Sequence, residues 1–107
     1  MQNVIVKGND NPVVMTFSFT GDFAASGLNT FTSVDLVIGG ETYSTDGTPT
    51  NLSIESDTEL RLKIGDTTTL DAGNYLPEII GYSATYDDGY LISGACKPIL
   101  GNIKVCE

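Results

Sequence analysis

The chain has 107 residues, a formal net charge of −9 with only five Lys and Arg, two cysteines and no histidine. The length fits one domain over residues 1–107, and the missing histidine removes the usual general base and the commonest metal ligand. So few basic residues exclude a cationic face for nucleic acid, and the acidic balance disfavours an anionic membrane. We therefore expect no cofactor, no nucleic-acid partner and no membrane partner.

The first part of the chain predicts two strands separated by a turn. Val4–Lys7 is a short opening strand, and Gly8–Pro12 has the Gly, Asn, Asp and Pro residues typical of a turn. Val13–Thr20 then alternates apolar and polar residues, which indicates a half-buried strand. Pro12 at its start is tolerated because a first residue need not donate to the ladder.

The longest irregular stretch is Gly21–Thr32, in which Ala24–Gly27 has the length for one helical turn only. A loop of this length is often functional or mobile. A β-sandwich also needs crossovers between its two sheets. We favour the crossover interpretation.

The middle of the chain predicts a hairpin and two further strands. Ser33–Ile38 alternates in period two, and Gly39-Gly40 suits a two-residue hairpin turn because both positions accept positive φ. Glu41–Ser44 is the return strand. Leu52–Ile54 and the strictly alternating Glu59–Ile64 follow.

The last part predicts a long extended run over Asn74–Tyr86, with Gly81 marking a bulge or bend. Asp88-Gly89 suits a type I′ hairpin turn into Tyr90–Ser93. Ile103–Val105 closes the domain as a final strand. About eight short strands at regular spacing predict an all-β fold, an immunoglobulin-like antiparallel β-sandwich. The expected core comprises Val13, Met15, Phe17, Phe19, Leu36, Ile38, Leu60, Leu62, Ile64, Ile103 and Val105.

Catalytic signals are weak. A serine nucleophile has no histidine to activate it, and no glycine-rich phosphate loop occurs. Two of the carboxylates Glu41, Glu55, Glu59 and Glu78 would suffice for a glycosidase, but the chain lacks the tryptophan platform usual in sugar sites. We expect no enzyme and no catalytic residues.

Calcium is the metal that the loops suit best, since Asn9–Asn11 and Asp87-Asp88 offer oxygen ligands. Their spacing matches no defined calcium loop, and Asn and Asp are simply favoured in turns. We interpret them as solvated turns and expect no metal site.

Cys96 and Cys106 form an even pair, so a disulfide is one alternative. No basic and apolar leader precedes the first strand, which predicts a cytosolic product with reduced thiols. Alternation places Cys106 on the face opposite Ile103 and Val105. Free thiols are favoured over a bridge, which would need the chain to reverse between the two cysteines.

Three tyrosines, Tyr82, Tyr86 and Tyr90, lie along one predicted hairpin. Tyrosine is enriched at interfaces because its ring is apolar and its hydroxyl stays wet. Cross-strand aromatic pairs also cover ordinary sheet surfaces. Both interpretations stay open, and the three residues are our candidate interface.

The order of the segments resembles the N-terminal sandwich module of phage baseplate upper proteins and related tail-adaptor domains. The segments that carry the resemblance are Ile5–Asp10, Val14–Thr20, Glu59–Ile64, the connector Gly65–Asp71, Ala72–Tyr75, Tyr75–Ile79 and Gly101–Val105. The loop Gly21–Thr32 is longer than in that family, and the chain stops soon after Val105 where the family continues. That ending predicts a stand-alone virion or assembly protein.

The resemblance implies an immunoglobulin-like sandwich that acts by protein–protein assembly, with no catalytic residues. It implies a phage or prophage virion or tail protein, in a baseplate or adaptor, with other virion or tail proteins as partners. It further implies a homo-oligomer, located in the virion and in the host cytoplasm during assembly. The alternative is a carbohydrate- or ligand-binding β-sandwich module, suggested by the tyrosine-bearing hairpin and the acidic loops.

Overall fold

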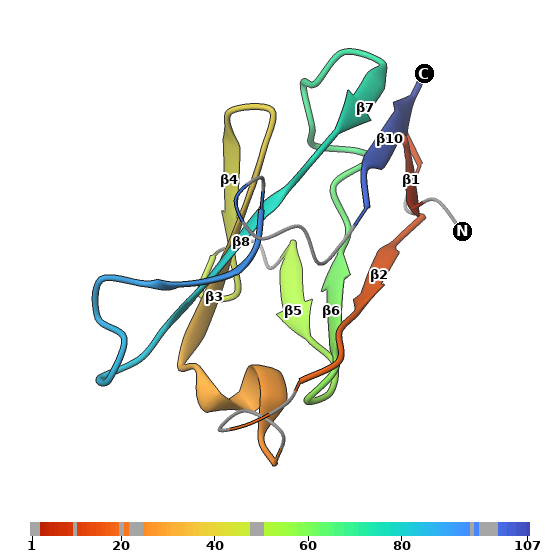
Figure 1. The fold of residues 1–107 in the computed structure, drawn as a ribbon. Coiled ribbons are helices and arrows are strands. Elements are labelled where there is room, and N and C mark those ends of the chain that lie inside the picture. Colours follow the sequence, from red (N-terminus) through yellow and green to blue (C-terminus); the bar gives the residue numbers. More distant parts are fainter. Residues whose placement is uncertain are drawn as a thin grey trace.

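The computed structural model describes residues 3–9, 11–19, 21, 25–47, 51–94, 96 and 101–107. Within them the chain forms ten strands, one 3₁₀ helix and no α-helix (Figure 1). The elements are β1 Asn3–Val6, β2 Val13–Thr16, η2 Gly27–Thr30, β3 Ser33–Ile38, β4 Glu41–Ser44, β5 Leu52–Ile54, β6 Glu59–Leu62, β7 Gly73–Tyr75, β8 Glu78–Tyr82, β9 Tyr90–Ser93 and β10 Ile103–Cys106. The predicted all-β class is confirmed.

The strands form three small open sheets. Sheet A has the order β1-β10-β7, sheet B β2-β6-β5 and sheet C β4-β3-β8-β9. Every pair is antiparallel except β1 and β10, which run parallel. The expectation of a purely antiparallel fold is therefore wrong at this pair. Parallel neighbours need a long connection, and here nearly the whole chain lies between the two strands.

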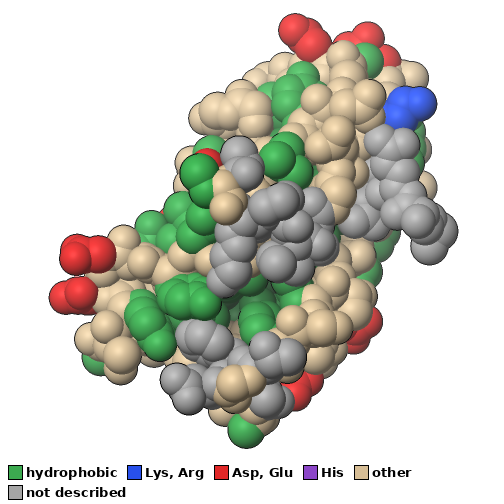
Figure 2. All heavy atoms as spheres, in the orientation of Figure 1, with side chains coloured by type: hydrophobic (Ala, Val, Ile, Leu, Met, Phe, Trp, Pro, Cys, Tyr) green, Lys and Arg blue, Asp and Glu red, His purple; other side chains and the backbone are tan. Residues whose placement is uncertain are grey.

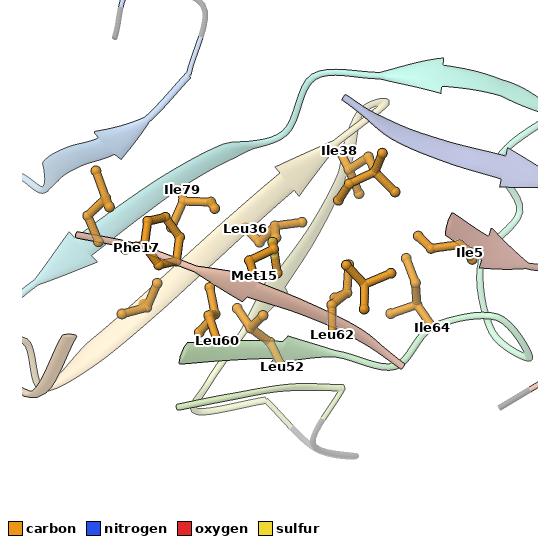
Figure 3. Packing of buried hydrophobic residues seen from close by; sticks show 14 of the residues in the cluster. Ile5, Met15, Phe17, Leu36, Ile38, Leu52, Leu60, Leu62, Ile64 and Ile79 are labelled. Atoms are coloured by element: carbon orange, nitrogen blue, oxygen red, sulfur yellow. The ribbon is translucent and has the colours of Figure 1, made fainter. Parts of the chain in front are cut away.

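One hydrophobic core joins all three sheets (Figure 3). Of the expected core residues, all are buried except Phe19, which is half-buried and packs against the rest. Alternation identified these positions because most of them lie on strands with one polar face, and Phe17, Phe19 and Ile64 lie shortly after such strands. The buried core residues outside the expected set are Ile5, Leu28, Phe31, Val34, Leu52, Leu70, Ile79 and Ile92.

Two predicted strands end earlier than expected. The run Val13–Thr20 keeps strand geometry only to Thr16, although the backbone N–H of Phe17 still donates to the Thr58 carbonyl at 2.8 Å. The run Glu59–Ile64 ends at Leu62. Thr20 lies outside the described residues.

The predicted extended run Asn74–Tyr86 is two strands rather than one. Its first part, β7, pairs with β10 in sheet A, whereas β8 pairs with β3 in sheet C. Leu76 and Pro77 separate the two strands. The chain changes sheet here, and Pro77 fits the break because it has no N–H to offer a ladder.

The two predicted hairpin turns have different outcomes. Gly39 and Gly40 have φ of 56° and 89°, as a tight two-residue turn between β3 and β4 requires. In the other turn Gly89 has φ of 97°, but Asp88 does not have positive φ. A type I′ turn needs both, so that prediction is wrong. Instead, the Gly89 N–H donates to the Tyr86 carbonyl at 3.1 Å.

The loop after β2 connects sheet B to sheet C, as the crossover interpretation predicted. Its helical turn is η2, later than the expected Ala24–Gly27, of which Ala24 lies outside the described residues. Leu28 of η2 is fully buried, and its N–H donates to the Asp57 carbonyl at 2.7 Å. The loop is therefore docked on the β5–β6 turn and contributes to the core.

Among the described residues, no helix has the length and apolar character needed to cross a membrane.

Candidate functional site

The candidate surface is the tyrosine hairpin, residues 82–90, at the junction of β8 and β9. In β8, Gly81 lies opposite Val34 on one side and Tyr90 on the other. The irregularity in this pair falls between Ile79 and Ile80. The prediction of a bulge at Gly81 is therefore wrong.

The missing side chain of Gly81 leaves space for a neighbouring ring. A Cβ built on Gly81 would lie 2.5 Å from Cγ and Cδ1 of Phe31. The buried Phe31 ring thus occupies the volume that any other residue at position 81 would fill. A glycine inside a strand can mark a close approach of another group as well as a bulge, and here the close approach of Phe31 is the reason for it.

Phe31 is the base of an aromatic cluster with Tyr86 and Tyr90. The ring centroid of Phe31 lies 6.0 Å from that of Tyr86 and 6.0 Å from that of Tyr90. Tyr86 and Tyr90 meet edge to face with centroids 5.3 Å apart. These distances and angles are those that aromatic pairs prefer. The structure therefore brings two of the three predicted interface tyrosines together.

Tyr82 lies apart from this cluster. Its neighbour Gly81 faces Phe31, and side chains alternate along a strand, so the Tyr82 ring points to the other face of sheet C. There it approaches Gly89, whose Cβ, if present, would lie 3.0 Å from Tyr82 Cε1. The tyrosines therefore occupy both faces of the hairpin.

Local hydrogen bonds hold the loop of the hairpin. The Tyr86 N–H donates to Ser83 Oγ at 3.2 Å, and the Ser83 N–H donates to the Tyr86 carbonyl at 3.3 Å. All three tyrosines are half-buried, whereas Asp87 and Asp88 are exposed. Figure 2 shows acidic side chains at the end of the molecule where Figure 1 places this loop. The hairpin combines aromatic surface with an acidic rim, which suits contact with another protein.

A second polar cluster surrounds Glu41, which sequence reasoning weighed only as a glycosidase carboxylate. Its Oε1 accepts from the hydroxyls of Tyr43 and Thr68, each at 2.7 Å. Its Oε2 accepts from the Thr69 hydroxyl at 2.6 Å and the Thr69 N–H at 3.0 Å. Strand β4 is thereby attached to the connector between β6 and β7. Only the run of threonines over residues 67–69 could have suggested this contact.

These contacts shift two pKa values. Burial raises the pKa of Glu41, but the hydrogen bonds from Thr69, Tyr43 and Thr68 together outweigh it and lower the pKa to about 2. Burial, with the hydrogen bond and charge of Glu41, raises the pKa of Tyr43 to about 12. At neutral pH the carboxylate is ionised and its acceptors are occupied. It is a structural anchor and is poorly suited to donate a proton.

The other carboxylates considered as catalytic candidates, Glu55, Glu59 and Glu78, do not lie together in one site. Glu55 lies 3.9 Å from Arg61, and Glu59 accepts from the Ser56 hydroxyl at 3.4 Å. Glu78 is exposed on β8. In the part of the chain that the structure describes, no three or more acidic, Cys or His side chains gather to hold a metal. Asp10 lies outside that part.

Both cysteines are free thiols. Cys96 is exposed, and Cys106 is half-buried at the end of β10. Ile103 and Val105 are buried on the opposite face of that strand, as the alternation predicted.

Comparison with known proteins returned no significant similarity. No protein-family model, no curated protein and no solved structure matches this chain. The fold and the candidate surface are therefore interpreted from this chain's own residues.

Proposed function

We propose that the chain is a structural protein of a phage or prophage virion, a baseplate or adaptor module of the tail that acts by protein–protein assembly. The proposal begins from the resemblance in segment order described above. It is supported by the way those segments meet in space.

The main observation behind this proposal is that the segments that carry the resemblance pair with one another as strands. They contain all or part of β1, β2, β6, β7 and β10, the strands of sheets A and B other than β5, and they also reach the start of β8 in sheet C. The pairs β1–β10, β10–β7 and β2–β6 each join two such segments. This pairing supports the proposal for the part of the chain that forms sheets A and B.

We further propose that the three sheets form an immunoglobulin-like sandwich. Sheets A and B would make one layer and sheet C the other, with the core between them. Figure 3 supports this arrangement, since Leu36 and Ile79 of sheet C face Met15 and Leu60 of sheet B. The partners would be other virion or tail proteins, met in the virion and in the host cytoplasm during assembly.

The tyrosine hairpin is the surface we assign to such a partner. Its half-buried rings and exposed Asp87 and Asp88 give an apolar centre with a polar rim, the usual anatomy of an interface.

The test is the protein content of purified particles. Phage particles and tail intermediates from an induced culture would be separated on gradients and analysed by quantitative mass spectrometry. We expect the chain to sediment with tails at a fixed ratio to a major tail protein. Its absence from both virions and intermediates would overturn the proposal.

The Tyr86–Tyr90 pair also favours a second candidate, a carbohydrate-binding module, because sugars stack on aromatic rings. Glycan-array binding that Tyr86→Ala and Tyr90→Ala both abolish would establish it. Tyr82→Ala, on the other face of the sheet, is the control and should leave such binding unchanged. Against this candidate, the two rings meet edge to face and both also pack on Phe31, instead of forming an open platform.

A further inference from the structure

Strand β2 presents unused backbone groups at one edge of sheet B. Among the described residues β2 pairs only with β6. The Phe17 N–H donates to the Thr58 carbonyl at 2.8 Å, which sets the alternation along this pair. In an antiparallel ladder every second residue points its N–H and C=O toward the same neighbour. The backbone N–H and C=O of Met15 therefore point to β6, whereas the N–H and C=O of Val14 and of Thr16 point away from it.

The two residues whose backbone groups point away are exposed to solvent. The Val14 side chain is 42% exposed, and Thr16 is exposed too. On the side away from β6, no described residue hydrogen-bonds to the backbone of either one. Figure 1 shows no further strand along this edge of β2.

This edge also lacks the usual protection against strand pairing. Natural edge strands carry charges, bulges or prolines that block a second chain. Residues 11–20 hold no charged residue, although the chain has a net charge of −9. Pro12 lies before the strand, where it removes one donor and leaves the rest. The β1 edge differs, because there the Val6 carbonyl already accepts the Asn9 N–H at 3.1 Å.

We propose that β2 pairs antiparallel with β2 of a second copy of this chain, about a two-fold axis at Met15. Val14 of each copy then lies opposite Thr16 of the other, and both residues exchange their outward N–H and C=O. The two copies of sheet B, with three strands each, become one continuous sheet. Isologous pairing of this kind is closed and stops at a dimer.

The register follows from the proline. With the axis at Met15, Pro12 lies opposite Ser18 of the second copy, at the end of the ladder. Its missing N–H then costs at most one terminal hydrogen bond. An axis at Val14 would move Pro12 opposite Thr16 and leave an outward acceptor of Thr16 without its donor.

Charges on the outer face favour the same register. Within each copy Val14 lies beside Arg61, and Thr16 lies beside Glu59. The proposed pairing therefore puts Arg61 of one copy in the same row as Glu59 of the other, about 14 Å apart at three strand spacings. Long side chains on a common face shorten that separation. An axis at Val14 would instead place Arg61 of one copy in the same row as Arg61 of the other.

This pairing deepens the proposed assembly role and rests on it for its use in the cell, but the contacts that would form it belong to sheet B and can be tested on the purified chain. The test uses the purified full chain in sedimentation velocity over a range of concentrations. We expect a monomer–dimer equilibrium whose dimer has twice the 11.3 kDa mass. Salt should strengthen it, because the two copies repel through their net charge of −9.

Val14→Lys should weaken the dimer by about tenfold or more, since an edge lysine resists strand pairing. Val4→Lys is the matched control, because Val4 is 37% exposed on the β1 edge and receives the same substitution. Val14→Pro should also dissociate the dimer, because it removes an outward N–H and leaves the β2–β6 hydrogen bonds in place. Circular dichroism checks that each variant folds.

A chain that stays monomeric at all concentrations would overturn the pairing, and so would a dimer that tolerates Val14→Lys. A dimer broken by Val4→Lys alone would place the contact at β1. The outcomes for the two proposals are separable. If the chain is a monomer in solution but sediments with tails, the proposed function stands and the β2 pairing is wrong. If it dimerises through β2 but is absent from particles, the β2 pairing stands and the proposed function is wrong.

Discussion

Glu41 shows how one side chain connects two distant segments. Its folded-state pKa of about 2 lies below the ordinary value of 4.5. A group with a depressed folded pKa adds stability above its unfolded pKa, and that stability is lost as the pH falls through the folded value. The Glu41 contribution should therefore be complete above about pH 4.5 and disappear toward pH 2.

Glu41→Gln should lower the free energy of unfolding at pH 7 by about 1–2 kcal/mol, because an amide cannot accept from donors at both of its ends. Urea unfolding at several pH values measures this. The gap between the two proteins should narrow between pH 4.5 and 2. Glu78→Gln, at an exposed position of β8, is the control and should change the free energy of unfolding little. A gap that does not depend on pH would contradict the assigned role.

Gly81→Ala should destabilise the protein by about 1–3 kcal/mol, the usual range for overpacking. The added Cβ collides with the Phe31 ring, 2.5 Å away. The chain has no tryptophan, so tyrosine fluorescence and near-ultraviolet circular dichroism report on the disturbed Tyr86 and Tyr90.

Gly101→Ala is the matched control, because among the described residues no atom lies within 4 Å of its added Cβ. Its effect should stay within about 0.5 kcal/mol. The double variant Gly81→Ala with Phe31→Leu should recover part of the loss, since a smaller side chain leaves room for the Cβ. Equal losses for Gly81→Ala and Gly101→Ala would show that Phe31 does not limit position 81.

The number of free thiols in the protein can be measured chemically. Ellman's reagent in denaturant should detect both thiols, because Cys96 and Cys106 are free. In the folded protein the exposed Cys96 should react faster than the half-buried Cys106. A count of zero, with a mass lower by two hydrogens, would mean that they are bridged.

At the scale of elements, β6 is the strand on which sheet B depends, since it lies between β2 and β5. Leu60 and Leu62 of β6 are fully buried. Leu62→Ala should cost about 2–5 kcal/mol through lost burial and the remaining cavity. Urea unfolding gives the value, and Val4→Ala on an exposed position should cost far less. A change under about 0.5 kcal/mol for Leu62→Ala would contradict its placement in the core.

At the scale of the whole molecule, β10 joins the two ends of the chain. It lies between β1 and β7 in sheet A, and Lys7 and Glu107 form an ion pair of 3.2 Å beside it. Contacts between residues so distant in sequence form slowly, because a long loop must close first. The sheet cannot be complete until the last strand has docked.

Ile103→Ala should therefore cost about 2–5 kcal/mol, because Ile103 is fully buried in the central strand of sheet A. Lys104→Ala, on the exposed face of the same strand, should stay within about 0.5 kcal/mol. Stopped-flow refolding should take milliseconds to seconds, as for other folds dominated by non-local pairing. Similar losses for the two variants would mean that the inward face of β10 is wrongly assigned.

The all-β class, the inward face of each alternating strand and the Gly39-Gly40 turn could be predicted from the sequence. These features depend on neighbouring residues, so period-two alternation and glycine dihedrals suffice to identify them. For the candidate surface, the sequence located the tyrosine-bearing hairpin but not which of its rings meet.

Which strands pair could be read only from the three-dimensional structure. It divided Asn74–Tyr86 between two sheets, made β1 and β10 parallel, and placed Phe31 on Gly81 and Glu41 on Thr68 and Thr69. Each of these contacts joins segments separated by other elements of the chain. Their formation depends on how the whole core packs, and no local pattern of residue types carries that information.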